Sequence, residues 1–145
     1  MKKQGCILHK MILAMFLLLA VGVGYAQEGI KVSVPFDFTV GKQTFPAGEY
    51  TVAPMPMSLN KMLLRNRTGE VLTFMQTNPA ESRERASSAR LVFNQYGGEY
   101  FLTQIWQGGS DFGQQLIKSS VEIEMARATQ SRVQLVALSS APNRQ

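Results

Sequence analysis

ARLVFNQYGGEYFLTQIW, residues 89–106, is the stretch of the chain that decides the fold. Apolar and polar side chains alternate on both sides of Gly97 and Gly98, and a period of two is typical of β-strands. A glycine pair suits a two-residue hairpin turn, because such turns need positive φ angles. The stretch therefore predicts a tight β-hairpin. Its expected register pairs three residues of one strand with three of the other: Gln95 with Tyr100, Phe93 with Leu102, and Leu91 with Gln104.

The two faces of this predicted hairpin differ in polarity. One face is expected to be core and carries only large apolar or aromatic side chains: Leu91, Phe93, Tyr100, Leu102 and Trp106. The other face mixes apolar with polar side chains, and its apolar members are Val92, Tyr96, Phe101 and Ile105. The second face is too apolar to be fully hydrated. We therefore expect a helix or the edge of a second sheet to cover part of it.

Much of the remaining chain also consists of short alternating segments between turn residues, which predicts a mainly all-β domain. KVSVPFDFTV (31–40) is expected to form one strand. Pro35 cannot donate to a hydrogen-bond ladder, so this strand should lie at an edge or carry a bulge. The segment KMLLRNRTGEVLTF predicts a second hairpin, with Asn66–Gly69 as its loop and Arg65 opposite Glu70.

Three further segments decide how many elements the domain has. NPAESRERASS (78–88) is polar and QGGSDFGQQ (107–115) is rich in glycine, and we expect both to be loops. SSVEIEMARA (119–128) is ambiguous. Ser119 and Glu122 have the spacing of a capping box, which favours a helix, whereas the alternation of apolar residues with glutamate favours a strand. We expect a short helix.

Together these segments predict an antiparallel β-sandwich or a small, partly open β-barrel of about seven strands, with one short helix near the C-terminus. Two of the expected strands lie at 49–54 and 132–139. The length suits a single domain over residues 27–140. Residues 141–145 are expected to form a loose tail.

The first 26 residues have the three parts of a secretory signal peptide. A basic start, MKKQGCILHK, precedes the apolar run MILAMFLLLAVGVG, and small Gly24 and Ala26 precede the expected cleavage point. The apolar run is shorter than the about 20 residues that a spanning helix needs. We therefore expect cleavage, a periplasmic or extracellular location, and no stable membrane span in the mature protein.

Composition excludes several classes of chemistry once the leader is removed. Cys6 and His9 are the only cysteine and histidine, and both lie in the leader. The mature chain would have no disulfide, no thiolate or imidazole catalysis and no zinc site of cysteine and histidine. Its formal net charge falls from +5 to +2, which does not indicate a nucleic-acid partner. We expect a protein that is not an enzyme and holds no cofactor.

Two stretches carry a resemblance to a known group of proteins. VPFDFTVGKQTFPAGEYTV (34–52) and ARLVFNQYGGEYFLTQIW, followed by LIKSSVEIEMARA (116–128), resemble small secreted β-rich proteins that are common in soil acidobacteria. The resemblance covers most of the mature chain. It implies an exported β-rich domain and carries no catalytic residue over to this sequence.

Five residues are candidate ligand contacts: Tyr96, Tyr100, Trp106, Asp111 and Phe112. Their aromatic rings could stack on a sugar or an apolar ligand, although aromatic side chains equally build cores. The loop expected at 107–115 is where we would place a ligand, because binding residues often lie on loops held by a rigid scaffold.

Two other constellations have weaker support. Met55, Met57 and Met62 could bind copper(I), which accepts thioether sulfur, although methionine also fills gaps in cores. Glycoside hydrolysis needs two carboxylates on either side of a cleft. The sequence offers four carboxylates for this, but nothing in it places two of them together: Asp37, Glu49, Glu99 and Asp111.

The sequence thus predicts an exported, non-enzymatic binding or structural module. Its partner would be a protein, a glycan or an apolar ligand, reached through the aromatic hairpin or through the edge strand at 31–40. One alternative is a carrier that holds a small apolar molecule in an internal cavity. Another is a carboxylate-dependent hydrolase.

Overall fold

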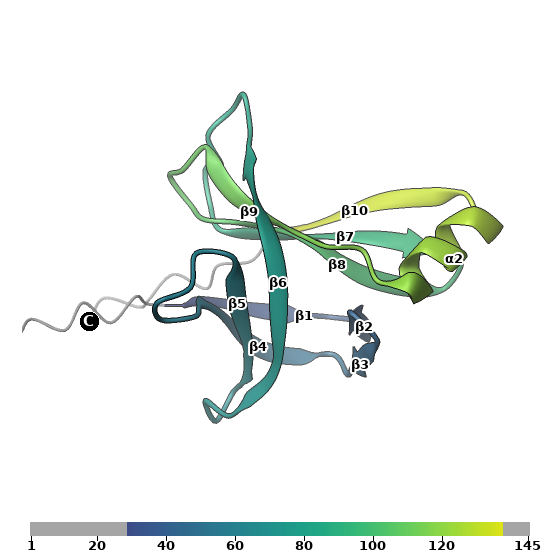
Figure 1. Cartoon of the computed structure of the whole chain (residues 1–145), viewed down its shortest axis with the longest axis horizontal. Coiled ribbons are helices and arrows are strands. Elements are labelled where there is room, and N and C mark those ends of the chain that lie inside the picture. Colours follow the sequence, from purple (N-terminus) through teal and green to yellow (C-terminus); the bar gives the residue numbers. More distant parts are fainter. Residues whose placement is uncertain (1–28, 138–145) are drawn as a thin grey trace, which may run out of the picture.

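The computed structural model describes residues 29–137, and within them the chain forms ten β-strands and one helix (Figure 1). The elements in chain order are β1 (Ile30–Val34), β2 (Phe38–Val40), β3 (Gln43–Phe45), β4 (Gly48–Pro54), β5 (Lys61–Asn66), β6 (Val71–Glu81), β7 (Arg90–Tyr96), β8 (Glu99–Trp106), β9 (Phe112–Leu116), α2 (Ser120–Ala128) and β10 (Ser131–Ala137). The mainly all-β class and the short helix near the C-terminus are confirmed. The predicted leader and the predicted tail lie outside the described residues.

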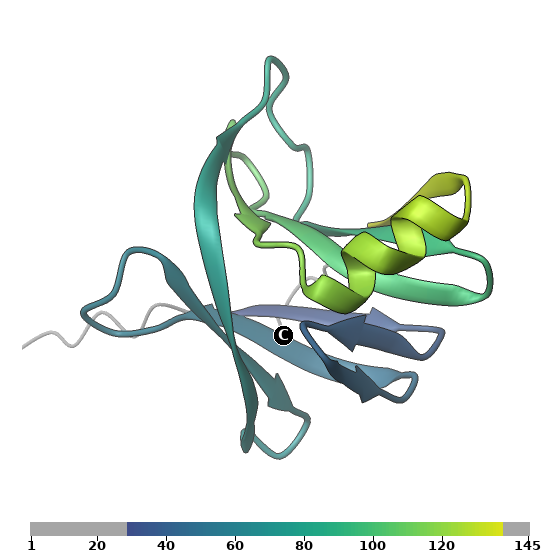
Figure 2. The same ribbon diagram turned by 45° about the vertical axis from the view of Figure 1, so that its right-hand side comes forward.

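One long strand, β6, joins the two halves of the structure. Its first part, Val71–Gln76, pairs with β5, and its second part, Thr77–Glu81, pairs with β9. The sheet is therefore folded over at β6. One half contains β1, β4 and β5, and the other contains β9, β8, β7 and β10, with β2 and β3 attached to β8 (Figures 1 and 2). In the described part of the chain the sheet stays open instead of closing into a barrel.

The segment expected to form a single strand at 31–40 forms two strands in different halves. β1 ends directly before Pro35 and pairs with β4 at one end of the sheet, which is the predicted edge position. β2 pairs with β3 and has a parallel bridge to β8, from Thr39 to Phe101. A proline cannot donate to a ladder, so the chain leaves the sheet here. This break and the unexpected strands β3 and β9 raise the number of strands above the expected seven.

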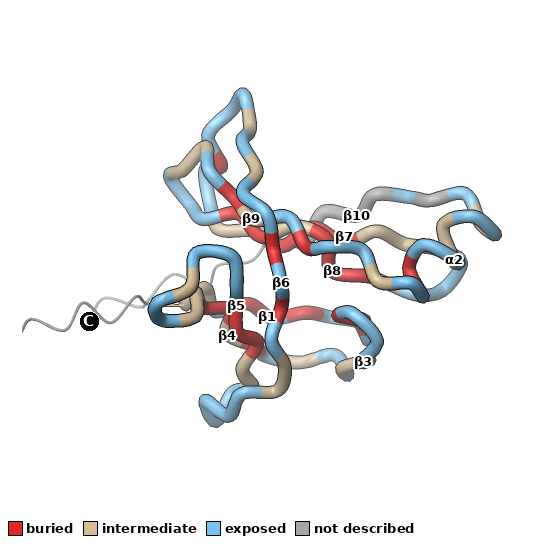
Figure 3. The backbone as a smooth tube through the Cα atoms, in the orientation of Figure 1, coloured by how far each residue is buried: buried red, intermediate tan, exposed pale blue. Residues whose placement is uncertain are grey.

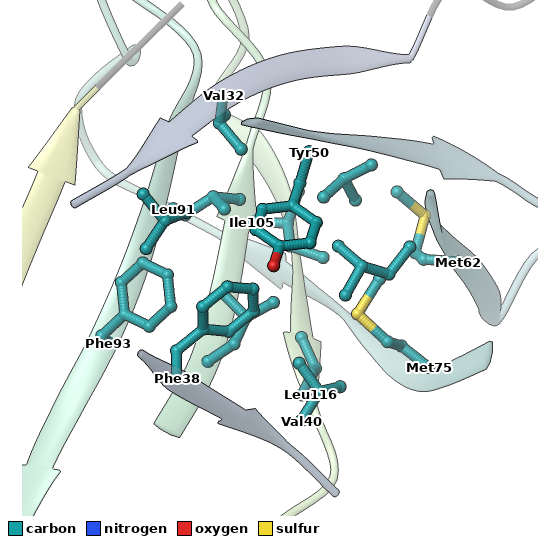
Figure 4. Close-up of a cluster of buried hydrophobic side chains, with 14 residues drawn as sticks. Val32, Phe38, Val40, Tyr50, Met62, Met75, Leu91, Phe93, Ile105 and Leu116 are labelled. Atoms are coloured by element: carbon teal, nitrogen blue, oxygen red, sulfur yellow. The ribbon is translucent and has the colours of Figure 1, made fainter. Parts of the chain in front are cut away.

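Aromatic rings connect the two halves at Phe38, which lies between Tyr50 and Phe93 (Figure 4). The Phe36 ring stacks on Tyr100 at a centroid distance of 4.0 Å and meets the Phe93 ring edge-on at 5.2 Å. The Phe38 ring meets Tyr50, from β4, at 5.1 Å and Phe93, from β7, at 5.5 Å. Edge-to-face pairs of this kind stabilise a core beyond the area that they bury. Fourteen buried side chains from both halves form the core around these rings (Figures 3 and 4).

The hairpin of β7 and β8 forms as predicted near its turn and differs beyond it. Gln95 lies opposite Tyr100, and Phe93 opposite Leu102, as expected. Beyond Phe93 the register shifts by one residue. Thr103 is the additional residue of this β-bulge, and its hydroxyl donates a hydrogen bond to the Val92 carbonyl at 3.0 Å.

Because of this bulge, two residues of β8, Ile105 and Trp106, lie on the opposite faces from those predicted. Leu91 lies opposite Ile105, not opposite Gln104 as predicted. One additional residue in a strand places each side chain that follows it on the opposite face of the sheet. Ile105 therefore belongs to the core, whereas Trp106 packs in a separate small cluster with Val92 and Ala86.

Trp106 is 5% exposed and is enclosed from several sides. Its Nε1 donates to Gln104 Oε1 at 3.1 Å, and the Arg90 guanidinium lies 5.6 Å from the ring centroid. Gly113 packs directly against the ring: a Cβ atom at this position would lie 2.5 Å from Trp106 Cε3. The ring is a packing element of the outer face and not an open stacking platform.

Three other expectations need correction. The second hairpin exists, but Arg65 lies opposite Val71 instead of Glu70, because a bulge interrupts the ladder after Leu64. The side chain of Glu70 accepts from the Asn66 amide at 3.0 Å. The two expected loops are shorter than predicted, because β6 continues to Glu81 and because β9 occupies residues 112–116. The two segments pair with each other, and β9 also pairs with β8, which local sequence does not reveal.

Helix α2 confirms the expectation for residues 119–128. Ser119 is its N-cap, and the Ser119 hydroxyl accepts from the Glu122 backbone N–H at 3.2 Å. The helix lies beside the outer face of β7 and β8 (Figure 2). It therefore covers part of the apolar second face of the hairpin, where Tyr96 and Phe101 lie.

Replacing Gly113 with alanine should lower the free energy of unfolding by about 1–3 kcal/mol, because the added methyl group overpacks Trp106. Gly98→Ala is the matched control, because no atom lies within 4 Å of a Cβ at that position. Urea denaturation of both variants measures the difference. Equal stability of the two variants would contradict the close packing of Gly113 on Trp106.

Replacing Phe38 with alanine should lower the free energy of unfolding by about 3–5 kcal/mol, because a fully buried ring is lost from between the two halves. Phe45→Ala removes a half-buried ring from the same cluster and should cost less than about 2 kcal/mol. Calorimetric unfolding gives both values. A smaller loss for Phe38→Ala than for Phe45→Ala would show that Phe38 does not connect the halves.

Candidate functional site

An open apolar groove of about 530 Å³ lies between the β4–β5 connection and β9. We call it the methionine groove, and its apolar side chains are Pro54, Met55, Met57, Leu59, Met62, Ile105 and Phe112. Ser58, Gln107 and Gln114 contribute its polar side chains, and no charged residue is part of its lining. Known ligand sites have volumes of about 300–1,000 Å³ and combine an apolar lining with a few polar groups.

Backbone hydrogen bonds fix the β4–β5 connection that forms one wall. Met55 N–H donates to the Lys61 carbonyl at 2.9 Å, and Ser58 N–H donates to the Met55 carbonyl at 3.2 Å. Thr77 N–H donates to the Asn60 carbonyl at 2.9 Å and attaches the connection to β6. The wall is therefore an ordered turn carried by the sheet.

Met57 has an unusual backbone conformation within this wall. Its φ is 60°, and among the described residues it is the one non-glycine residue with positive φ. The left-handed region costs an L-residue about 1–2 kcal/mol. The side chain gains no burial in return, because Met57 is fully exposed. Strain of this kind at the rim of a groove motivates a hypothesis of function.

The groove leads from exposed rim residues to the core. Leu59 at the rim is 93% exposed and Phe112 is 59% exposed. Met62 and Ile105 form the floor, and both also belong to the buried core between the halves (Figure 4). An apolar group placed in the groove would therefore contact core side chains directly.

Residues 107–111 form the part of the expected loop that precedes β9, and they are attached to residues 82–86. Gly109 N–H donates to the Ala86 carbonyl at 2.7 Å, and Ser82 N–H donates to the Asp111 carbonyl at 2.9 Å. The Ser110 hydroxyl accepts from Phe112 N–H at 3.0 Å. These bonds position Phe112 at the start of β9, with its ring at the rim of the groove.

The predicted ligand contacts lie in different places. Tyr96 is buried under α2, Tyr100 is half-buried in its stack with Phe36, and Trp106 is buried on the outer face. Asp111 is half-buried in the loop, and its backbone carbonyl is occupied by Ser82. Phe112 lines the methionine groove.

The three predicted copper ligands, Met55, Met57 and Met62, line the same groove. Copper(I) binding at these residues stays a prediction. Leu59 and Ile105 are groove residues that the sequence did not identify as a site. A fully exposed leucine within a loop would have been the available signal for Leu59.

Two of the four carboxylates considered for hydrolysis, Asp37 and Glu49, have separate partners. Asp37 Oδ1 accepts from Ala47 N–H at 2.9 Å, and Glu49 forms an exposed ion pair with Arg67 at 3.4 Å. Exposed pairs of this kind contribute about 0–1 kcal/mol to stability. Between residues 29 and 137 there is no group of three or more His, Cys, Asp or Glu residues that could hold a metal ion.

No protein family, no curated protein and no solved structure matches this chain. Among the described residues, α2 is too short to cross a membrane, and we find no membrane-spanning helix there.

Replacing Met57 with glycine should raise the free energy of unfolding by about 0.5 kcal/mol. Glycine relieves the left-handed strain, which stabilises the folded protein by about 1–2 kcal/mol. Glycine also increases the conformational entropy of the unfolded chain, which destabilises the folded protein by a smaller amount, about 0.4–1 kcal/mol. Ser58→Gly, at the next residue, gains no such relief and should lower stability by about 0.4–1 kcal/mol. Thermal unfolding compares the two. An equal loss in both variants would show that Met57 is not strained.

Proposed function

We propose that the protein is an exported, non-enzymatic binding module whose methionine groove receives an apolar segment of a partner polypeptide. The observation that carries this proposal is Met57, a fully exposed apolar side chain held at positive φ on the rim of an uncharged groove. Neither its burial nor its backbone conformation stabilises the free protein, so its position is understood best as part of a binding surface.

The chemistry of the groove supports an apolar, uncharged occupant. Its walls offer thioethers, one leucine and one phenylalanine, and its floor is continuous with the core. Methionine side chains are flexible and polarizable, and they adapt to partners of varied shape. A charged group placed here would lose hydration without gaining a partner of opposite charge.

The polar side chains of the groove suit an extended peptide. The Thr77 hydroxyl donates to Gln114 Oε1 at 2.8 Å, which leaves the Gln114 amide hydrogens as donors. Gln107 and Ser58 can both donate and accept. A peptide backbone offers the complementary carbonyl and N–H groups, and its apolar side chains could occupy the groove.

Rim geometry favours a polypeptide over a small carried molecule. Small-ligand sites generally enclose about 70–90% of their ligand, whereas Met57 and Leu59 extend into solvent. The space between the two halves is occupied by the core side chains. The volume of the groove nevertheless fits a small apolar molecule, so a carrier is the second candidate.

Export rests on the sequence of residues 1–26, and the non-enzymatic assignment rests on the absence of cysteine and histidine from the sequence after that leader. N-terminal sequencing of the protein recovered from its native host tests export. A mature N-terminus at Gln27 in the extracytoplasmic fraction is the expected result, and a cytoplasmic protein that retains Met1 would exclude export.

Methionine methyl NMR should map the occupant onto the groove. Residues 27–145 contain five methionines, and three of them line the groove: Met55, Met57 and Met62. A short lysine-tailed peptide with leucine and phenylalanine at alternate positions should shift these three methyl resonances and leave Met125, on α2, unchanged. Octyl glucoside monomers and free glucose serve as the small-apolar and glycan probes. Saturation by octyl glucoside without any response to the peptide would favour the carrier.

Replacing Phe112 with serine should weaken peptide binding at least about tenfold, because burial of a phenylalanine contributes about 1.5–3 kcal/mol. Phe74→Ser is the matched control, since Phe74 is 63% exposed, similar to Phe112 at 59%, but does not line the groove. Titration calorimetry measures both affinities. Equal losses in the two variants would indicate nonspecific apolar association and would contradict the site.

A further inference from the structure

Helix α2 buries a carboxylate where a helix normally buries apolar side chains. Glu122 is 4% exposed and is the one buried residue of α2. Val121 and Ile123 of the same helix are each 39% exposed. A helix on the surface of a globular protein usually turns an apolar stripe toward the core. The attachment of α2 therefore depends to an unusual degree on one ionisable group.

A short chain of hydrogen bonds connects this carboxylate to the sheet. The Tyr96 hydroxyl donates to Glu122 Oε1 at 3.3 Å, and the Asn94 amide donates to the Tyr96 hydroxyl at 3.1 Å. The Tyr96 ring lies 5.7 Å from the Phe101 ring, edge to face. Glu122 is thus placed directly over the aromatic part of the outer face of β7 and β8.

The charged groups around Glu122 compensate its charge only in part. Lys118, just before the helix, is the cation that favours the ionised form. On β8, Glu99 lies opposite Tyr96 and carries a like charge. On β10, Arg132 lies opposite Gln95 and is exposed. On the helix itself, Glu124 and Arg127 are exposed.

Burial raises the pKa of Glu122 above the ordinary value of 4.5, despite the opposing effects of Lys118 and of the hydrogen bonds from Tyr96 and Asn94. A carboxyl whose pKa is raised by docking stabilises the docked state most fully when it is protonated. This stabilisation is complete below the ordinary carboxyl pKa. It is lost as the pH rises through the higher pKa of the docked helix.

We propose that α2 acts as a pH-dependent clasp, which means that the helix docks more firmly on the outer face of β7 and β8 at low pH than at neutral pH. Protonated Glu122 accepts from Tyr96 without a net charge under the helix, and α2 stays docked. Ionised Glu122 is hydrated more favourably in solvent, so the helix opens and uncovers Tyr96 and Phe101. The clasp lies on a different surface from the methionine groove and does not depend on the function proposed for that groove.

Amide hydrogen exchange of the protein at pH 4 and at pH 7.5, corrected for the intrinsic exchange rates, tests the clasp. The protection factors of residues 120–128 should fall several-fold at the higher pH, whereas those of β7 and β8 should change little. Met125 lies on α2, so its methyl resonance should titrate with the same midpoint. Met57 is distant from the helix and its methyl resonance should not follow that transition.

Glu122→Gln should keep α2 protected at both pH values, because an amide cannot ionise. Glu124→Gln alters an exposed glutamate on the same helix and should leave the wild-type response intact. Tyr96→Phe removes the hydroxyl donor to the carboxylate and should move the Met125 midpoint to higher pH, which keeps the proposal testable if Glu122→Gln does not fold. Equal protection of wild-type α2 at both pH values, or a response retained in Glu122→Gln, would overturn the proposal.

Discussion

The packing of the Phe38 ring between the two halves of the sheet is the interaction on which the structure depends. The chain leaves β1 at Pro35 and enters the opposite half at β2, which places the Phe38 ring between Tyr50 of one half and Phe93 of the other. In the described part of the chain the sheet has open ends, and this shared core keeps the halves together. The methionine groove depends on the same packing, since its floor combines Met62 from one half with Ile105 from the other.

Local patterns in the sequence predicted the elements that form through local interactions. Gly97 and Gly98 specified the turn of the β7–β8 hairpin, and the spacing of Ser119 and Glu122 specified the start of α2. The bulge at Thr103 could not be predicted in this way. Ile105 and Trp106 are both apolar, and alternation alone does not reveal which of them fits the core. That choice depends on Gly113, which leaves room for the indole ring on the outer face.

The candidate site was predicted in pieces and not as a whole. The segment 107–115 was expected to carry a ligand, Phe112 was a candidate contact, and the three methionines were grouped as possible metal ligands. Their meeting in one groove follows from the pairing of β6 with β9, which brings Thr77 opposite Leu116. No local periodicity encodes this pairing, because its two strands are distant in sequence and both segments have the composition of loops. The sequence therefore indicated the residue types of the groove but not their assembly.

The division of β6 between two partners has a consequence for the growing polypeptide. Residues 77–81 cannot form their ladder with β9 until the ribosome has passed Leu116, so an incomplete chain has an unpaired strand edge. Such edges pair with neighbouring chains and start aggregation. Pro79 interrupts this edge because it has no N–H to donate, and the charged residues Glu81, Arg83, Glu84 and Arg85 follow it. This short stretch thereby limits misassembly during synthesis, before β9 is available to pair with it.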